Sequence, residues 1–334
     1  MQHGDPPSSV PGLERPGRPL ISIVVPVYNE EACVDEMARR VATVFSTVEA
    51  DFELIFVNDG SSDDTLACIT RTAETDPRIR YVSFSRNFGH QHALAAGIDH
   101  AFGDAVVTLD GDLQHPPELI PDLISHWRAG DDVVYTIRES NAGHALKEVV
   151  SKLFYWSIRK LTGVQVPTGG ADFRLIDRRV ANYLRQCREH AVFVRGLIPW
   201  LGFRNKGIPY HCQERFGGET KYVPSRMIRF ALDGVFSFST VPLRLISILG
   251  AVTITLGFLY GTYSVLIRLF TDQAVSGWTS LVIVVLVFSG TQLISLGILS
   301  EYVGRIYDEV KRRPRYVIEA KSPELELDQK SEAG

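Results

Sequence analysis

The chain has few cysteines and no large excess of charge of either sign. Only four cysteines occur among its 334 residues, and none stands in a Cys-x-x-Cys pair or near a histidine at zinc-binding spacing. These absences argue against a disulfide-stabilised secreted domain and against a structural zinc site. The formal net charge of −4 gives no reason to expect a nucleic acid as a partner.

Two common nucleotide-binding motifs are also missing. No Gly-x-Gly-x-x-Gly follows the first apolar run, and no Gly-x-x-x-x-Gly-Lys-Ser/Thr occurs anywhere. In dinucleotide-binding folds and P-loop ATPases, these glycine-rich loops bring backbone amides close to phosphate groups. A chain that binds a diphosphate without them needs another source of positive charge, and a metal ion would supply it.

Two long segments near the C-terminus lack charged residues altogether. None lies between Arg244 and Arg268, and none lies between Asp272 and Glu301. Because about 20 helical residues cross the hydrocarbon core of a bilayer, residues 243–304 are expected to form a hairpin of two transmembrane helices, at about 243–267 and 281–303. The alternative is a pair of helices buried in a large soluble core, although uncharged apolar runs of this length are uncommon in soluble folds.

Basic residues flank this hairpin on its outer sides, whereas the short connecting loop has only Arg268 against Asp272. They are Arg226, Arg229, Arg244, Arg305, Lys311, Arg312, Arg313 and Arg315. By the positive-inside rule, we expect a multi-pass protein of the inner (plasma) membrane with both termini and the N-terminal domain in the cytoplasm. Gly250, Gly257 and Gly261 either pack within the hairpin or let two copies meet in a homo-oligomer.

Composition divides the rest of the chain. Residues 1–19 hold five prolines and little apolar content, which indicates a disordered leader. Residues 225–242 mix basic with aromatic and aliphatic side chains, which predicts a juxtamembrane amphipathic helix that lies in the bilayer interface or packs on the preceding domain. Residues 305–334 form a cytoplasmic C-terminal tail, and we expect its polar, acidic end from Ser322 to be disordered.

Residues 20–224 alternate short apolar runs with longer segments of helical periodicity. The runs predict strands at Leu20–Val27, Phe52–Asn58, Ile79–Ser85, Ala105–Asp110 and Asp132–Ile137, and the segments between them predict helices at Glu31–Val48, Ser62–Thr75, His90–Phe102 and Pro117–Ala129. This order predicts an α/β catalytic domain with a mostly parallel, Rossmann-like sheet and helices on both faces. Ligands of such sheets bind at the carboxyl ends of the strands, and polar residues follow the first four strands here.

Asp110, Asp112 and Gln114 come at the end of the fourth predicted strand. In an extended segment, alternate residues point to one side, and oxygen ligands at this spacing suit Mg²⁺ or Mn²⁺ with open positions for phosphate oxygens. The alternative is a capped turn, since aspartate is frequent in loops. Asp59 ends the second strand, where its carboxylate can accept a hydrogen bond from a nucleoside, whereas the polar residues after it are explained by helix capping.

Five motifs occur in the order and spacing of the family 2 glycosyltransferases. They are Pro26-Val27-Tyr28-Asn29-Glu30, Val57-Asn58-Asp59-Gly60-Ser61, Ser85-Arg86-Asn87-Phe88-Gly89, Asp110-Gly111-Asp112-Leu113-Gln114 and Ala171-Asp172-Phe173-Arg174-Leu175. From about Leu20 to Arg315, the chain more narrowly resembles the polyprenyl-phosphate glycosyltransferases. These include dolichol-phosphate mannose synthase and, closer to this chain, the bactoprenol (undecaprenyl-phosphate) glucosyltransferases.

The resemblance implies a GT-A fold, a Mg²⁺ or Mn²⁺ cofactor, and an inverting transfer of a hexose, glucose from UDP-glucose, to polyprenyl phosphate in the bilayer. It places around the nucleotide sugar Pro26, Tyr28, Glu30, Asp59, Asp110, Gly111, Arg215 and Lys221. It places at the metal Asp110, Asp112 and Gln114. It makes Asp112 and Asp172 catalytic, with Asp172 as the proposed base near the acceptor. It assigns to the lipid phosphate Arg138, Lys152 and Arg174.

The chemistry leaves the role of Asp172 open. The second pKa of a phosphate monoester is about 6, so the acceptor is largely a dianion at neutral pH and needs charge compensation more than deprotonation. Asp172 then either abstracts a proton or orients its neighbours. A third interpretation is a salt bridge with Arg174 or Arg178 and no further role.

His115 departs from the family, whose members commonly have aspartate after the Leu-Gln pair. It either caps the helix that begins at Pro116, or it weakens metal binding, or it makes metal binding sensitive to pH. We expect the transferase activity to survive the change.

Three other functions fit parts of the sequence. One is the transfer of another sugar, such as mannose, an N-acetylhexosamine or a modified arabinose, to the same lipid. A processive polysaccharide synthase is disfavoured because the Gln/Arg-x-x-Arg-Trp motif is absent and two crossings are few for a polymer channel. An inactive nucleotide-sugar sensor is disfavoured because Asp112, Gln114 and Asp172 are retained.

Overall fold

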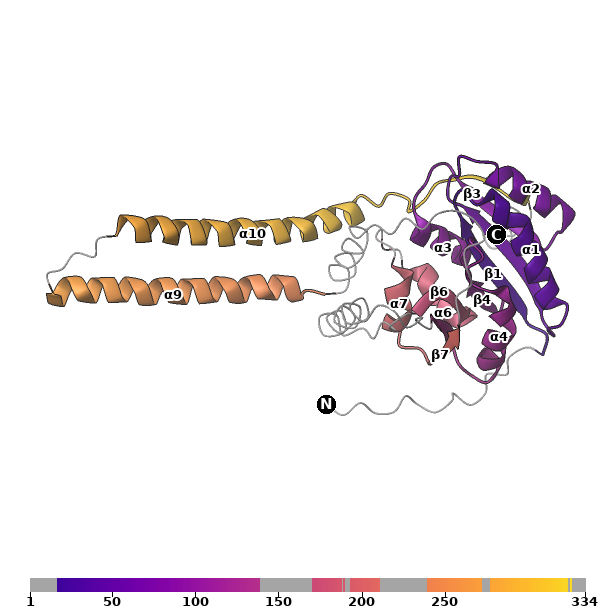
Figure 1. Cartoon of the computed structure of the whole chain (residues 1–334), viewed down its shortest axis with the longest axis horizontal. Helices are drawn as coiled ribbons and strands as arrows, with labels where there is room; N and C mark the ends of the chain where they lie inside the picture. The colour runs from indigo at the N-terminus through magenta and orange to yellow at the C-terminus, as the bar shows by residue number, and fades with distance from the viewer. Residues whose placement is uncertain are drawn as a thin grey trace, which may run out of the picture. The chain divides into compact units, whose positions relative to one another are not determined.

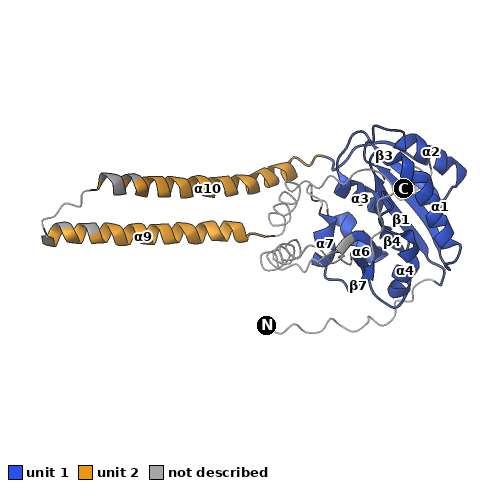
Figure 2. Cartoon of the chain, in the orientation of Figure 1, with its two compact units in different colours: residues 1–159, 164–223, 314–334 blue, residues 160–163, 224–313 orange. Residues whose placement is uncertain are grey.

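The computed structural model describes residues 17–138, 170–187, 189, 193–210, 239–271, 277–323 and 325. The chain divides into two compact units (Figure 2). Unit 1 comprises residues 1–159, 164–223 and 314–334, and unit 2 comprises residues 160–163 and 224–313. The C-terminal residues therefore belong to the same unit as the N-terminal α/β region, although the apolar segments separate them in sequence.

Unit 1 is built on an eight-stranded mixed sheet with the order β7-β5-β6-β4-β1-β2-β3-β8. Figure 1 shows helices packed around this sheet. Its strands are β1 (Leu20–Val27), β2 (Asp51–Asn58), β3 (Ile79–Phe84), β4 (Ala105–Thr108), β5 (Val133–Arg138), β6 (Gly170–Asp177), β7 (Asn205–Tyr210) and β8 (Ile318–Lys321). Neighbours are parallel from β4 through β1 and β2 to β3, and β7 is parallel to β5. By contrast, β6 runs antiparallel to both β4 and β5, and β8 runs antiparallel to β3. The predicted α/β class is confirmed: of the eight strands described, six run in one direction, and β6 and β8 run in the opposite direction.

Helices pack on both faces of the sheet. The side chains of β1 point alternately to one face and to the other, and they contact helices on each. Ile21, on one face, belongs to the buried cluster that contains Met37 and Trp127 from two of the helices. On the other face, Val24 meets Gly97, where an added Cβ would lie 2.1 Å from Val24 Cγ1, so that only glycine permits this approach. The helices are α1 (Glu31–Phe45), α2 (Thr65–Thr75), α3 (His90–Asp99), η1 (Pro117–Leu119), α4 (Ile120–Arg128), α6 (Arg178–Gln186) and α7 (Val194–Trp200).

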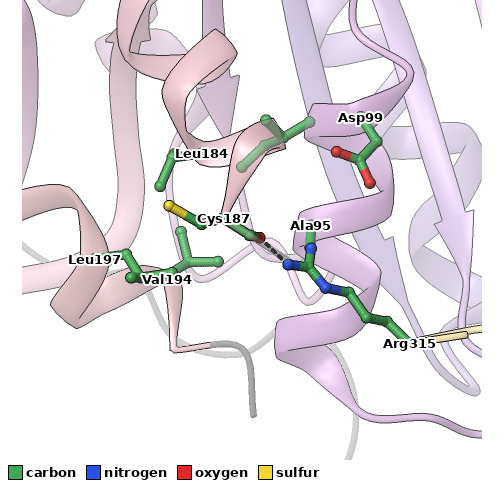
Figure 3. A pocket seen from close by; sticks show the side chains of 8 residues that line it. Ala95, Asp99, Leu184, Cys187, Val194, Leu197 and Arg315 are labelled. Atoms are coloured by element: carbon green, nitrogen blue, oxygen red, sulfur yellow. Dashed lines mark hydrogen bonds between the residues drawn. The ribbon is translucent and has the colours of Figure 1, made fainter. Parts of the chain in front are cut away.

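The chain returns to unit 1 after the apolar helices and adds the edge strand β8 to the sheet. Ser322 and Leu325 are both buried, so the disorder predicted from Ser322 onward is wrong for these two residues. Arg315 donates a hydrogen bond to the Cys187 carbonyl in a small, mostly apolar pocket between α3, α6 and α7 (Figure 3). The Tyr316 hydroxyl donates to Asp99 Oδ2 at 3.0 Å, at the end of α3. A segment predicted to be a tail therefore contributes to the α/β domain.

Unit 2 contains the two long helices α9 (Val241–Thr271) and α10 (Trp278–Val310). Each includes a span long and apolar enough to cross a membrane, and no residue in either apolar window is buried. Core helices of a soluble domain would be mostly buried, which these two windows are not. Gly257 lies against α10, where an added Cβ would be 3.1 Å from Phe288 Cζ, whereas nothing lies within 4 Å of Gly250 or Gly261. Of the three glycines, Gly257 packs within the hairpin.

Candidate active site

The order of the strands brings residues from distant parts of the sequence together beside β4. Strand β6 pairs with β4 in a register that sets Thr108 opposite Arg174, and the Thr108 hydroxyl donates to the backbone carbonyl of Asp172. His90 begins α3, and its Nε2 lies 3.5 Å from Asp110 Oδ1 and 3.3 Å from Asp172 Oδ2. One ligand atom from each of His90, Asp110 and Asp172 lies within 4.8 Å of the others. Two of the predicted site residues, Asp110 and Asp172, thus share one cluster.

Asp110 uses one of its two carboxylate oxygens in a hydrogen bond to a buried histidine. Its Oδ2 lies 2.9 Å from His115 Nε2, and His115 Nδ1 lies 2.7 Å from the Tyr210 hydroxyl. Its Oδ1 is buried and accepts no hydrogen bond within the described part of the chain. Burial opposes ionisation of Asp110, but the hydrogen bond from His115 and the charge of His90 outweigh it and lower its pKa.

The turn after β4 differs from the extended segment that the sequence predicted. Strand β4 ends at Thr108, and Leu113 adopts a φ of 59° with its side chain buried. Asp112 Oδ1 then accepts a hydrogen bond from the backbone amide of Gln114 at 3.1 Å. The predicted strand-like alternation of Asp110, Asp112 and Gln114 is therefore wrong. Burial of the Leu113 side chain in the core goes with a left-handed backbone at that residue, and this backbone forms a turn and not an extended strand.

The turn after β4 lies directly against the end of β1, which leaves no room for a side chain at Gly111. A Cβ there would be 2.6 Å from Val27 Cγ1 and 2.9 Å from the Pro26 carbonyl oxygen. Pro26 itself is buried. The contact of Gly111 with β1 therefore sets the position of Asp110 and Asp112 relative to the first strand.

Asp172 is surrounded by positive charge. Arg174 donates to Oδ1 at 2.8 Å, and Arg195 donates to Oδ1 at 3.0 Å and to Oδ2 at 2.6 Å. Burial opposes ionisation of Asp172, but the bond to His90 and the two guanidinium groups prevail and place its pKa well below the usual range. Of the two ion-pair partners considered from the sequence, Arg174 is confirmed, while Arg178 is exposed at the start of α6.

Asp59 holds a neighbouring loop in place. Its carboxylate accepts hydrogen bonds from the backbone amides of Phe88 at 2.7 Å and Gly89 at 2.9 Å, and its residue is only 3% exposed. Burial raises its pKa, against the effect of these bonds. Since Gly89 immediately precedes His90, Asp59 fixes the start of α3. Its predicted contact with a nucleoside stays a prediction.

The remaining predicted residues fall into two groups. Tyr28 is 47% exposed and Glu30 is half-buried, at the carboxyl end of β1, where the sequence places a nucleotide. The backbone of Arg138 ends β5, and nothing further is described of it. Outside the described residues lie Lys152, Arg215, Lys221 and residues 225–238. Their roles stay predictions.

Three residues that contact Asp110, Asp172 or His115 were not predicted from the sequence as site residues: His90, Arg195 and Tyr210. His90 directly follows the motif that ends at Gly89, and this adjacency was the available signal. Arg195 and Tyr210 stand in segments without a recognised motif, so only the fold identifies them.

The residues present fit a divalent cation. A buried carboxylate oxygen without a hydrogen-bond donor, such as Asp110 Oδ1 among the described residues, is the hard oxygen ligand that Mg²⁺ and Mn²⁺ prefer. Two ligand sets include Asp110: the set predicted from the sequence, with Asp112 and Gln114 from the same turn, and the set that the structure brings together, with His90 and Asp172. The guanidinium groups on Asp172 compete with a cation for its oxygens, so the first set is better suited.

Comparison with known proteins gives consistent results. A family model described as Glycosyl transferase family 2 matches residues 22–184. The uncharacterized glycosyltransferase YkcC of Bacillus subtilis is 43% identical over 299 residues, 89% of this chain and 93% of that protein. The prophage bactoprenol glucosyl transferase homolog of Escherichia coli is 38% identical over 299 residues, 89% of this chain and 98% of that protein.

Solved structures are more distant. Glucosyl-3-phosphoglycerate synthase from Mycobacterium tuberculosis, in complex with Mn²⁺, uridine diphosphate and phosphoglyceric acid, has a TM-score of 0.47 at 16% identity. The match covers 67% of this chain and 82% of that one. A similarity this low does not establish shared ligands.

Proposed function

Because the chain belongs to glycosyltransferase family 2, we propose that it transfers glucose from UDP-glucose to polyprenyl phosphate and releases UDP. The observation that carries this proposal is the match to proteins named bactoprenol glucosyl transferase over 89% of the chain. Only 35 of the 334 residues (334 − 299) fall outside that alignment, so it includes most of the two apolar helices as well as the α/β domain. We further propose that the helices span the inner membrane and that the α/β domain faces the cytoplasm.

In this proposal, Asp110 and Asp112 hold Mg²⁺ or Mn²⁺ together with the diphosphate of the donor. The cation would supply positive charge where negative charge grows on the departing UDP. Asp110 has one oxygen bonded to His115 and the other turned toward the cluster, so it suits this role. Tyr28, Glu30 and the loop fixed by Asp59 lie at the carboxyl ends of β1–β3, where the nucleoside is proposed to bind.

The acceptor phosphate attacks the anomeric carbon of glucose while the bond from that carbon to the UDP oxygen breaks. Attack from the opposite face inverts the configuration, so an α-linked donor gives a β-linked lipid phosphoglucose. The low pKa of Asp172 makes it a weak base, and a phosphate dianion needs no base. We therefore assign Asp172 to holding His90 and Arg195 in position, rather than to proton abstraction.

The test is a transfer assay with the full chain in vesicles that contain undecaprenyl phosphate. The protein is incubated with single nucleotide sugars and Mg²⁺ or Mn²⁺, and lipid extracts are analysed by mass spectrometry. We expect one hexose added per lipid with UDP-glucose. Asp112→Asn is expected to reduce transfer about a thousandfold, since a metal ligand contributes several kcal/mol and each 1.4 kcal/mol is about tenfold.

Asp122→Asn is the matched control, because Asp122 is an exposed carboxylate on α4, and it should transfer at the parent rate. Full activity of Asp112→Asn would overturn its metal role. A product only with another nucleotide sugar would replace glucose in the proposal, and a long polymer would replace it with a processive synthase.

A further inference from the structure

We propose that His115 and Tyr210 position Asp110 through a chain of hydrogen bonds, so that Oδ2 is occupied and Oδ1 is presented to the cation of the donor complex. The inference rests on the proposed function, because it deepens the role given to Asp110. It also gives a role to the unusual His115, for which the sequence left three interpretations.

The chain of contacts is short and buried. His115 is 7% exposed and Tyr210 is 4% exposed. The two bonds, Tyr210 hydroxyl to His115 Nδ1 and His115 Nε2 to Asp110 Oδ2, measure 2.7 Å and 2.9 Å. Because both residues are buried, bulk water does not compete for these two hydrogen bonds, and they are stronger than they would be at the surface.

We assign the direction of the bonds from the chemistry of the three groups, because the roles of the two ring nitrogens depend on the tautomer. A carboxylate such as that of Asp110 accepts only. Nε2 of His115 must therefore carry the proton that it donates to Asp110. Nδ1 then accepts from the hydroxyl of Tyr210. One hydroxyl thus selects the tautomer of His115 that holds Asp110, which is how outer groups usually orient the ligands of a metal.

Both ring nitrogens of His115 are thereby occupied, so His115 is not itself placed to be a metal ligand. The interpretation in which it caps the helix after Pro116 also fails, because η1 has no side-chain cap. His115 acts on the site through Asp110.

Packing makes this support rigid. The ring centroid of Phe173 lies 5.7 Å from that of His115 and 6.4 Å from that of Tyr210, with an edge-on contact in the second case. Phe173 is fully buried on β6, between Asp172 and Arg174. By contrast, His90, which faces the other oxygen of Asp110, has a side chain that is 43% exposed. Asp110 is therefore held on the Oδ2 side by buried partners, whereas its buried Oδ1 accepts no hydrogen bond among the described residues and faces the more exposed side chain of His90.

Tyr210 comes from far away in the sheet. It is the last residue of β7, and β5 and β6 stand between β7 and β4 in the strand order. Since β6 is antiparallel to both β4 and β5, and β7 is parallel to β5, the carboxyl ends of β4, β5 and β7 lie at the same edge of the sheet. Tyr210, 100 positions after Asp110, can therefore reach the turn that follows β4.

The test is the Tyr210→Phe variant of the full chain, which removes only the hydroxyl. We expect its affinity for Mn²⁺ in the presence of UDP, measured by calorimetry, to fall about 10-fold to 100-fold, the usual loss when an outer partner of a metal ligand is removed. Tyr135→Phe is the matched control: Tyr135 is a half-buried tyrosine on the adjacent strand β5 and should bind Mn²⁺ and UDP as the parent does. Thermal unfolding of each variant checks that it is folded.

A double-mutant cycle separates positioning from packing. His115→Gln keeps an amide donor for Asp110 but offers no ring nitrogen to the hydroxyl of Tyr210. If the hydroxyl acts through His115, Tyr210→Phe will weaken Mn²⁺ binding in the parent and change it little in the His115→Gln background. An equal loss in both backgrounds, or unchanged Mn²⁺ affinity in folded Tyr210→Phe, would overturn the proposal.

The binding and transfer assays can fail separately. If no glucolipid forms with any donor but Tyr210→Phe still weakens Mn²⁺ binding with UDP, the proposed function falls and the positioning role stands. If the glucolipid forms and Tyr210→Phe binds Mn²⁺ and UDP like the parent, the positioning role falls alone.

Discussion

Asp110 and Asp172 lie on either side of His90, yet the two carboxylates are held in opposite ways. Asp110 is bonded through one oxygen to His115, and its other oxygen accepts no hydrogen bond among the described residues. Asp172 is bonded through both oxygens to two guanidinium groups, and its side chain is 5% exposed against 31% for Asp110.

This difference indicates that the two carboxylates are suited to different roles. A carboxylate with one oxygen that accepts no hydrogen bond is suited to bind a ligand, whereas one with both oxygens bonded to guanidinium groups is suited to hold those groups in place. Both are ionised, since the pKa of each is lowered, but the cause differs. For Asp110 it is mainly one hydrogen bond from a histidine, and for Asp172 it is a histidine together with two arginines.

The most direct test of this difference between Asp110 and Asp172 is to replace each carboxylate by its amide. Asp110→Asn should weaken Mn²⁺-dependent binding of UDP about a thousandfold, because it removes a ligand charge worth several kcal/mol. Asp172→Asn should lower turnover but change the binding of UDP by less than about threefold. Calorimetric titration of both variants with UDP and Mn²⁺ measures this. Equal losses of UDP affinity would show that the two carboxylates form one metal site.

A second experiment removes the buried partner of Asp172. Arg174→Met should reduce the free energy of unfolding by about 3 kcal/mol, the lower end of the range for breaking a buried ion pair, because Arg195 still compensates Asp172. Urea unfolding, followed by the fluorescence of the buried Trp127, measures it.

Arg178→Met is the control for this experiment. Arg178 is exposed only four residues further on, so its loss should change stability by less than about 0.5 kcal/mol. A similar small change in Arg174→Met would mean that the ion pair contributes nothing to the fold.

The smallest expected effect concerns pH. The folded pKa of Asp172 lies well below its unfolded value of about 3.9. Its contribution to stability is therefore complete above about pH 4 and is lost only as the pH falls through the lower, folded value. Asp172 stays ionised from about pH 5 to pH 8, so Asp172→Asn should lower the transfer rate without moving the acid limb of its pH profile. A shift of the acid limb in Asp172→Asn would instead support the interpretation of Asp172 as the base.

The strands from β1 to β4 and the helices between them were predicted closely from the sequence, because each is signalled by a local pattern. Leu20–Val27 is identical to the predicted strand, and α1 begins at Glu31 as expected. Strands β6, β7 and β8 were not predicted. Their partners are far away in the sequence, and short segments such as Ile318–Lys321 carry little periodic signal.

The site divides in the same way. Asp110 and Asp172 were predicted to belong to one site because both stand in motifs of the family, and the structure places both beside His90; their roles stay predictions. The bonds that give them different properties come from Arg195, Tyr210 and His90, and no local pattern marks the first two. Even the expected geometry of Asp112 failed, because the turn that buries Leu113 is decided by packing against the core.

By itself, the sequence determined the family, the class of fold, two apolar helices and the candidate carboxylates of the site, since these follow from short-range patterns and ordered motifs. Only the tertiary structure decided which carboxylate keeps an oxygen without a hydrogen bond among the described residues and which has both oxygens bonded to arginines. That depends on hydrogen bonds between strands that are neighbours in the sheet but distant along the chain, and on burial that strengthens those bonds by excluding water.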